Sequence, residues 1–230
     1  MYKEDFIWLE AFNSLRDREL DYSMCCEKTF MNNIGAFITG FKFYAFELLK
    51  EGKRITLPIF DYLCELILQG ESKKHNIRCS YLSWYSIIDL YANSNNEART
   101  VFLSYLDKVN EFVSSGNYEI RDDESEEMHI SKMLEAMRPR PGIYLGDVSL
   151  ELMVKAVEGF CLRNPHSQKL FDGFQVFTEK RYNEPNMHGY KWGRIIHALS
   201  YSDRDALDVF FKLWDKFIQS ENKTEGKNKR

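Results

Sequence analysis

The chain has 230 residues, of which 44% are hydrophobic, and a formal net charge of −4 at pH 7. This length and composition suffice for one large domain or two small ones that fold without disulfides or metals. The acidic balance argues against a general nucleic-acid-binding protein, because neutralising phosphates requires a basic surface.

The chain shows no sign of export or membrane insertion. It has no apolar run of about 18 residues, which a membrane span needs, and its first residues, MYKEDFIWLE, place acids where a secretory signal needs cations. Its five cysteines include no C-x-x-C pair, so we expect reduced thiols, no cofactor or metal, and a cytoplasmic protein. They are Cys25, Cys26, Cys64, Cys79 and Cys161.

Helical periodicity begins near the N-terminus. Apolar residues at i, i+3, i+4 and i+7 predict a first helix from about Glu4 to Arg18, and the same spacing recurs 122 residues later, at 130–137. A second helix contains Gly40, and its counterpart 119 residues later contains Gly159. Because glycine inside a helix costs about 1 kcal/mol relative to alanine, we expect a close approach of two helices at these positions.

Three further helices follow in each half. The third begins at Thr56-Leu-Pro58, a hydroxyl N-cap followed by proline, and Ser167 takes the place of Thr56 in its counterpart 111 residues later. The fourth contains Trp84, or Trp192 in the second half. The fifth begins with a capping box, Ser94-x-x-Glu97, whose relative in the second half is Ser202-x-x-Asp205.

These correspondences amount to an internal repeat. Trp84 to Val109 and Trp192 to Phe217 agree at nine of 26 positions without a gap. The distance between corresponding helices falls from 122 to 108 residues along the chain. Every insertion or deletion therefore lies between helices, where loops tolerate it. We therefore predict an all-α protein, a tandem duplication of a five-helix unit packed as one compact body. The expected parts are a degenerate first unit (1–118), an acidic junction (119–127), a second unit (128–220) and a charged, disordered tail (221–230).

The most distinctive local sequence is Arg138-Pro-Arg-Pro-Gly-Ile-Tyr-Leu-Gly146. In a structural interpretation, Pro-Gly sets a tight turn, Tyr144 packs, Arg138 and Arg140 pair with acidic faces, and Gly146 leads the chain into an Asp147/Ser149 helix cap. In the functional interpretation, Arg138, Arg140 and Tyr144 contact a ligand or a protein partner. The sequence leaves both open.

A run of acids joins the two units. It contains Asp122, Asp123, Glu124, Glu126 and Glu127. Like charges this close repel and stay hydrated, so a solvated linker accounts for them. The functional alternative is a negative surface that occupies the substrate groove of a basic nuclease.

Three other features suggest chemistry less specifically. His197 lies near Asp203 and Asp205 and could form an acid–base pair, although a surface or partly buried histidine is the simpler interpretation. The aromatic, partly basic stretch from Lys180 to Trp192 could stack nucleobases, or it is a surface loop before a buried tryptophan. No zinc signature, phosphate-binding glycine loop or Cys/His nucleophile pair is present in the sequence.

The turn at 138–146 resembles the RPGMYIG stretch of the ATPase domain of type II topoisomerase B subunits. In that family it precedes a helix with a catalytic acid and a magnesium-binding asparagine. Here the following helix, Ser149 to Leu162, contains no D-N-x-x-D-E, and no later G-x-x-G-x-G exists. We therefore do not expect such an ATPase.

Residues 130–218 are more similar to a group of small bacterial all-α proteins, most without an assigned activity. The group shares an RPxMYLG-like turn, a Gly-aromatic helix end, an F-D-x-F helix, a lone Trp before Ile-Ile, and an S-x-x-x-A-x-x-x-F helix. The matching segments are 140–146 (with Ile143 where methionine is usual), 159–160, 171–174, 192 and 202–210.

Proteins of this group often lie in toxin–immunity or defence neighbourhoods. The resemblance therefore implies a non-enzymatic immunity protein that binds a cognate toxin, most plausibly a basic nuclease, and blocks its active site. The alternatives are a ligand-sensing or regulatory component of a bacterial defence system and, third, a hydrolase with an unrecognised site. We expect no direct contact with nucleic acid or membrane.

Overall fold

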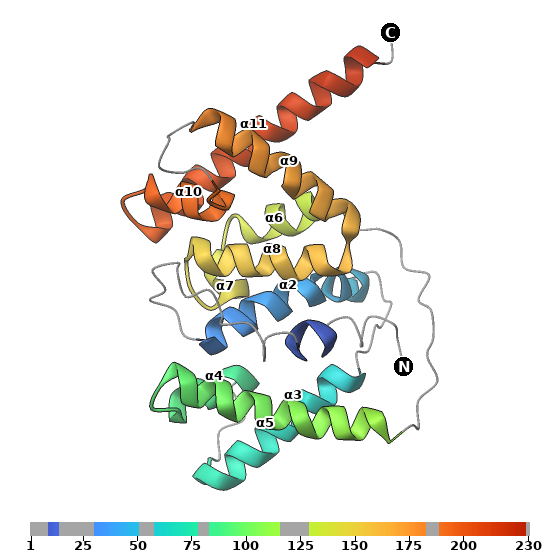
Figure 1. Ribbon diagram of the computed structural model, residues 1–230, viewed down its shortest axis with the longest axis vertical. Helices are drawn as coiled ribbons and strands as arrows, with labels where there is room; N and C mark the ends of the chain where they lie inside the picture. Colours follow the sequence, from blue (N-terminus) through green and yellow to red (C-terminus); the bar gives the residue numbers. More distant parts are fainter. Residues whose placement is uncertain are drawn as a thin grey trace.

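The computed structural model describes residues 9–13, 30–50, 58–77, 83–115, 129–182 and 189–228, and within these ranges every regular element is a helix. The all-α prediction is confirmed. A short helical stretch at 9–13 precedes the other helices, which follow one another along the chain (Figure 1). They are α2 (Phe30–Lys50), α3 (Pro58–His75), α4 (Trp84–Tyr91), α5 (Asn95–Ser114), α6 (Ile130–Met137), α7 (Pro141–Leu145), α8 (Leu150–Arg163), α9 (Pro165–Arg181), α10 (Trp192–Ala198) and α11 (Asp203–Asn228).

The helices enclose two hydrophobic cores. One is built from described residues of the N-terminal half, 9–115, and includes Phe12, Phe102 and Leu106. The other is built from the C-terminal half, 129–228, and is rich in aromatic rings. Rings in contact have centroids 4.7–6.5 Å apart; they belong to Phe171, Phe174, Trp192, Phe210 and Trp214. Helix α2 also contributes Ala36 and Phe43 to this second core.

Helices α2 and α8 pack against each other in the middle of the molecule and join the halves (Figure 1). Their crossing is as close as the sequence predicts. A Cβ atom on Gly40 would lie 1.8 Å from the carbonyl oxygen of Ala156, and one on Gly159 would lie 1.9 Å from that of Phe37. Only a residue without a side chain fits at either position.

Both predicted capping boxes form. The hydroxyl of Ser94 accepts the N–H of Glu97 (3.2 Å), whose carboxylate accepts the N–H of Asn93 (2.7 Å). The second half repeats the arrangement, although its acid is shorter. The hydroxyl of Ser202 accepts the N–H of Asp205 (3.2 Å), and the carboxylate of Asp205 accepts the N–H of Tyr201 (3.0 Å).

Three local predictions are corrected. The Pro-Gly segment forms the short helix α7 instead of a tight turn, because Pro141 has the backbone geometry of a first helical residue. Helix α9 is capped by Asn164, whose side chain accepts the N–H of Ser167 (2.9 Å), so Ser167 lies inside the helix and is buried. Helix α11 continues to Asn228 and does not give way to a disordered tail after 220.

Candidate functional site

Arg138, which begins the distinctive turn, folds back onto the protein's own helix α11. Its guanidinium donates to the carbonyl oxygen of Phe211 (3.1 Å) and to Oδ1 of Asp215 (2.6 Å), and it lies 4.7 Å from the centre of the Phe211 ring. Each of these contacts ties the turn to α11. The structural interpretation therefore describes Arg138 well, since its guanidinium already has a hydrogen-bond acceptor and an ion-pair partner within the chain.

Tyr144 and Arg140, the other two residues predicted at this site, differ in exposure. Tyr144 is half-buried, and its ring packs against Phe43 of α2 with 6.1 Å between centroids. The side chain of Arg140 is exposed, and among the described residues no ion pair holds it. Ile143 beside it is 70% exposed. The turn therefore presents a cation and an aliphatic side chain to solvent, while Tyr144 anchors it to α2.

The turn ends in a left-handed glycine, as its role at a helix end requires. Gly146 has φ 80°, and its N–H donates to the carbonyl of Gly142. The predicted cap at Asp147 and Ser149 forms only in part. Ser149 occupies the N-cap position of α8, but its hydroxyl is buried and makes no hydrogen bond there.

The five acids predicted as a partner surface lie outside the described residues. They are Asp122, Asp123, Glu124, Glu126 and Glu127. Their role stays a prediction. In the described ranges, no three histidine, cysteine or carboxylate side chains are grouped so that they could bind a metal.

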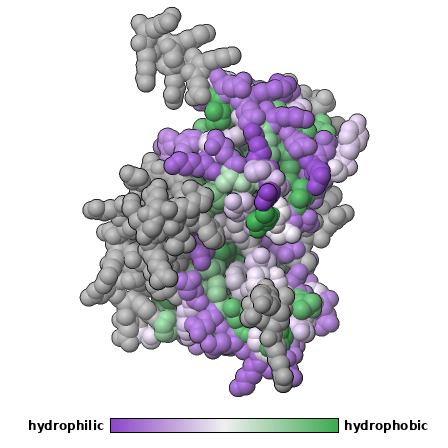
Figure 2. Space-filling view, turned by 180° about the vertical axis from the view of Figure 1, so that it is seen from behind, coloured by the Kyte–Doolittle hydropathy of each residue, from purple (hydrophilic) through white to green (hydrophobic). Residues whose placement is uncertain are grey.

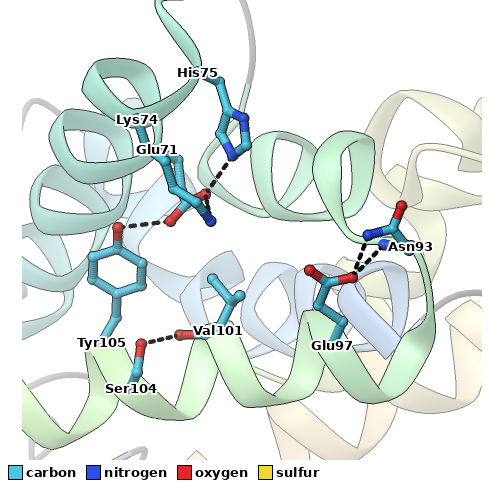
Figure 3. A network of polar contacts seen from close by, with 8 residues as sticks. All are labelled: Glu71, Lys74, His75, Asn93, Glu97, Val101, Ser104 and Tyr105. Carbon is cyan, nitrogen blue, oxygen red and sulfur yellow. Dashed lines mark hydrogen bonds and ion pairs between the residues drawn. The ribbon is translucent and has the colours of Figure 1, made fainter.

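A buried polar cluster that the sequence did not predict lies where α3, α4 and α5 meet (Figure 3). Glu71 is only 4% exposed, and its Oε1 accepts the hydroxyl of Tyr105 (2.8 Å). Its Oε2 lies 3.2 Å from Nε2 of His75 and 3.5 Å from Nζ of Lys74. The imidazole of His75 stacks on Tyr91, with ring centroids 4.0 Å apart and planes at 12°. The carboxylate of Glu71 thus joins α3 to α5, and His75 extends the cluster to α4.

The phenol of Tyr105 has a raised pKa in this cluster. Burial raises the pKa of its phenol, and the hydrogen bond to Glu71 and the negative charge of that carboxylate raise it further. The close approach depends on Gly70, because a Cβ there would lie 2.1 Å from the Tyr105 hydroxyl oxygen. The His75 ring turns its Nδ1 away from Glu71 (Figure 3). Within the described residues, the cluster holds α3, α4 and α5 together.

Sequence did contain a signal for this cluster. Glu71 follows Leu63 and Ile67 at intervals of four residues, so it continues the stripe of α3 that faces the core. A carboxylate at the end of an apolar stripe needs hydrogen-bond donors on the facing helix. The chain offers Tyr105 there, but no spacing rule links the two residues across 34 positions.

The structure brings His197 and Asp203 together. Nε2 of His197 lies 3.5 Å from Oδ1 of Asp203, while Asp205 instead caps the helix. The imidazole is half exposed, so water screens the pair. This geometry fits a surface histidine at the α10–α11 turn better than a tuned acid–base pair.

The segment before α10 is only partly described. Gln175 of α9 accepts the N–H of Trp192 (2.6 Å) and donates to the carbonyl of Tyr190 (2.8 Å), so it fastens the entry to the helix. The guanidinium of Arg194 lies 4.1 Å from the centre of the Tyr190 ring and covers it. Trp192 is buried, as the surface-loop interpretation predicts. Arg194 therefore occupies one face of the Tyr190 ring on which a nucleobase could otherwise stack.

A few large apolar side chains are exposed. Tyr201 is 101% exposed and Leu199 39%, both at the α10–α11 turn, and Leu90, near the end of α4, is 61% exposed. On the face seen in Figure 2, green apolar residues are separated by purple polar ones and do not form a continuous patch. No described helix is long and apolar enough to span a bilayer. The candidate contacts are therefore discrete side chains.

Comparison with known proteins finds no matching family model, no matching curated protein and no matching solved structure.

Proposed function

We propose that this chain is a cytoplasmic immunity protein, without catalytic activity of its own, that binds a cognate toxin and blocks its active site. The toxin is most plausibly a basic nuclease. The observation that supports binding most directly is Tyr201, an aromatic side chain wholly exposed beside the exposed Leu199. Exposed tyrosines on ordered turns are typical anchors of protein interfaces, because they bury a large area and lose few rotamers.

Net charge supports the choice of toxin class. A protein of charge −4 attracts a basic nuclease, and electrostatic attraction speeds the encounter and disfavours wrong partners. The acids from Asp122 to Glu127 would compete with nucleic acid for the nuclease groove. Replacing all five with serine should then slow association with the toxin, most strongly at low salt.

The test is co-expression with each of the proteins encoded beside this chain's gene. We expect one of these neighbours, a small basic protein, to arrest growth alone, and co-expression of this chain to restore growth through a tight one-to-one complex. Growth arrest that this chain does not relieve, or relief without complex formation, would refute the proposal. Turnover of nucleic acid by the chain itself would also refute it.

Arg140 favours a second candidate, a ligand-sensing component of a defence system. Its exposed guanidinium, unpaired among the described residues, could bind an anionic ligand at α7. Nucleotides should then raise the melting temperature of the wild type but not of Arg140→Ala. If no nucleotide shifts the melting temperature of the wild type, this candidate is rejected.

We also propose that the scaffold arose by tandem duplication. The two capping boxes, at Ser94 and Ser202, and the reciprocal contacts of Gly40 and Gly159 support this origin. Each pair occupies positions that correspond between the halves. A duplicated scaffold presents corresponding turns twice, which widens the surface available to a partner.

A further inference from the structure

The exposed apolar side chains are unevenly distributed over the molecule. Of the eight large ones exposed among the described residues, five belong to the end of α4, to α7 and to the α10–α11 turn. These three segments lie along one edge of the molecule, the left edge in Figure 1, with α7 between the other two. We call this set the turn edge; it consists of Leu90, Tyr91, Ile143, Leu199 and Tyr201.

Ordered backbone supports the turn edge. The boxes at Ser94 and Ser202 fix the turns that follow α4 and α10, since each has reciprocal side-chain hydrogen bonds of 2.7–3.2 Å. Tyr91 is held further by its stack on His75. A partner would therefore meet apolar groups whose backbone is already ordered, and preorganisation lowers the entropy lost on binding.

The segments that carry these apolar groups contain more acids than bases. Segments 90–97, 140–151 and 199–205 contain five carboxylates but only two guanidinium groups. The reason is structural, because α5, α8 and α11 all begin at this edge, and helix N-termini favour acids. The hydrogen bonds from Asn93 lower the pKa of Glu97, which keeps it ionised. The carboxylates are Glu97, Asp147, Glu151, Asp203 and Asp205, and the cations are Arg140 and Arg204.

We propose that the turn edge is the docking surface for a basic protein, which places Tyr201 and Leu90 in apolar sockets and its lysines and arginines against the surrounding carboxylates. This assignment rests on the proposed function and identifies the face by which the toxin is held. Apolar anchors within a charged rim match the usual division of an interface into a core that supplies affinity and a rim that steers association.

Site-specific photo-crosslinking in the host cell tests the face directly. p-Benzoylphenylalanine replaces Tyr201 in one full-length variant, Leu90 in a second and Val176 in a third. Val176 is the matched control, because it is an exposed apolar residue (46%) of α9, outside the turn edge. We expect positions 201 and 90 to give an adduct with the same basic protein, identified by mass spectrometry, and position 176 to give none.

Other outcomes overturn the proposal. They are an adduct with a second copy of this chain, an adduct with an acidic protein, an equal yield at position 176, or no adduct at 201 and 90. Rescue from the neighbouring toxin is scored in parallel. If the chain rescues growth but the expected adducts are absent, the turn edge is not the docking surface, although the immunity function still holds. If the wild-type chain does not rescue growth, the immunity function itself is rejected.

Affinity measurements provide a second readout. Tyr201→Ala should raise the Kd for the neighbouring basic protein at least about tenfold, as expected for an aromatic anchor. Val176→Ala should leave the Kd within about twofold. Glu151→Gln should slow association at low salt and change dissociation little. Equal effects of the first two substitutions would exclude Tyr201 as an anchor.

Discussion

Gly40 and Gly159 make the same contact in opposite directions. Gly40 lies against the carbonyl of Ala156, which is three residues before Gly159, and Gly159 lies against the carbonyl of Phe37, which is three residues before Gly40. The crossing of α2 and α8 is therefore locally two-fold symmetric. A side chain at either glycine would push the two halves apart.

Gly40→Ala or Gly159→Ala should destabilise the fold strongly. The added methyl group would meet backbone at 1.8 or 1.9 Å, which no rotamer change relieves, so we expect a loss of about 3 kcal/mol or more, at the upper end for overpacking. Gly142→Ala is the matched control, because its nearest neighbour would be 3.7 Å away. Urea denaturation followed by circular dichroism measures the difference. Equal midpoints for Gly159→Ala and Gly142→Ala would contradict the close crossing.

Tyr105→Phe should cost about 1.5–3 kcal/mol at neutral pH, because it removes a hydrogen bond to the buried carboxylate of Glu71. Tyr201→Phe, at a fully exposed position, should cost nothing measurable. The comparison isolates the phenol–carboxylate hydrogen bond from the general effect of removing a tyrosine hydroxyl. Equal unfolding free energies for the two variants would show that Glu71 does not depend on Tyr105.

Alkaline pH should weaken the wild type more than Tyr105→Phe. The folded protein raises the pKa of Tyr105 above the ordinary value of 10.0, so folding favours the neutral phenol. This stabilisation is complete below pH 10 and is lost as the pH rises toward the folded pKa, because the unfolded chain releases its proton first. Urea midpoints between about pH 8 and 11.5 should therefore converge for the two proteins. Parallel curves would contradict the assignment.

Cys64 and Cys161 should resist alkylation in the folded protein. Burial raises the pKa of each thiol to about 12, and the thiolate is the reactive form. After brief treatment with iodoacetamide at pH 8, peptide mapping should find both unmodified, and both should react fully in denaturant. Rapid modification of Cys161 in the native protein would show that its part of the core opens readily.

Arg138→Ala should destabilise the protein by about 1 kcal/mol, since it removes a hydrogen bond to Phe211, an ion pair with Asp215 and the stacking on the Phe211 ring. Arg140→Ala should change stability by less than about 0.5 kcal/mol. Thermal melts of the two variants measure this. A larger loss for Arg140→Ala would mean that the roles of the two arginines are reversed.

Sequence predicted the parts of this fold that depend on periodicity. Apolar stripes marked the helices, and glycine inside two stripes marked the crossing of α2 and α8. The buried hydrogen bond of Glu71 could not be predicted, because its partner, Tyr105, is remote in sequence and only tertiary packing brings the two together. The polar composition after position 220 predicts a disordered tail, and this prediction was wrong, because α11 extends to Asn228. An established helix can extend through such residues, since extension needs no new nucleus.

The sequence singles out Arg138, Arg140 and Tyr144 at the distinctive turn, but it does not predict how their side chains are oriented. No pattern in the sequence distinguishes Arg138, which pairs with Asp215, from Arg140, which has no ion pair within the described residues. The difference comes from the irregular backbone at Arg140, before α7 begins. The turn edge escaped prediction for a related reason, because exposure at helix ends depends on which neighbours the fold supplies.

Helix α2 belongs to both cores, since its Ile34, Ile38 and Phe41 lie in the N-terminal core while its Ala36 and Phe43 lie in the other. Pulling α2 out of either core would expose the other to water as well. The two halves should therefore melt in a single cooperative step even though each has its own core. In the cell, the protein would then be either fully folded or fully unfolded, and no partly folded form would be available for cleavage by proteases.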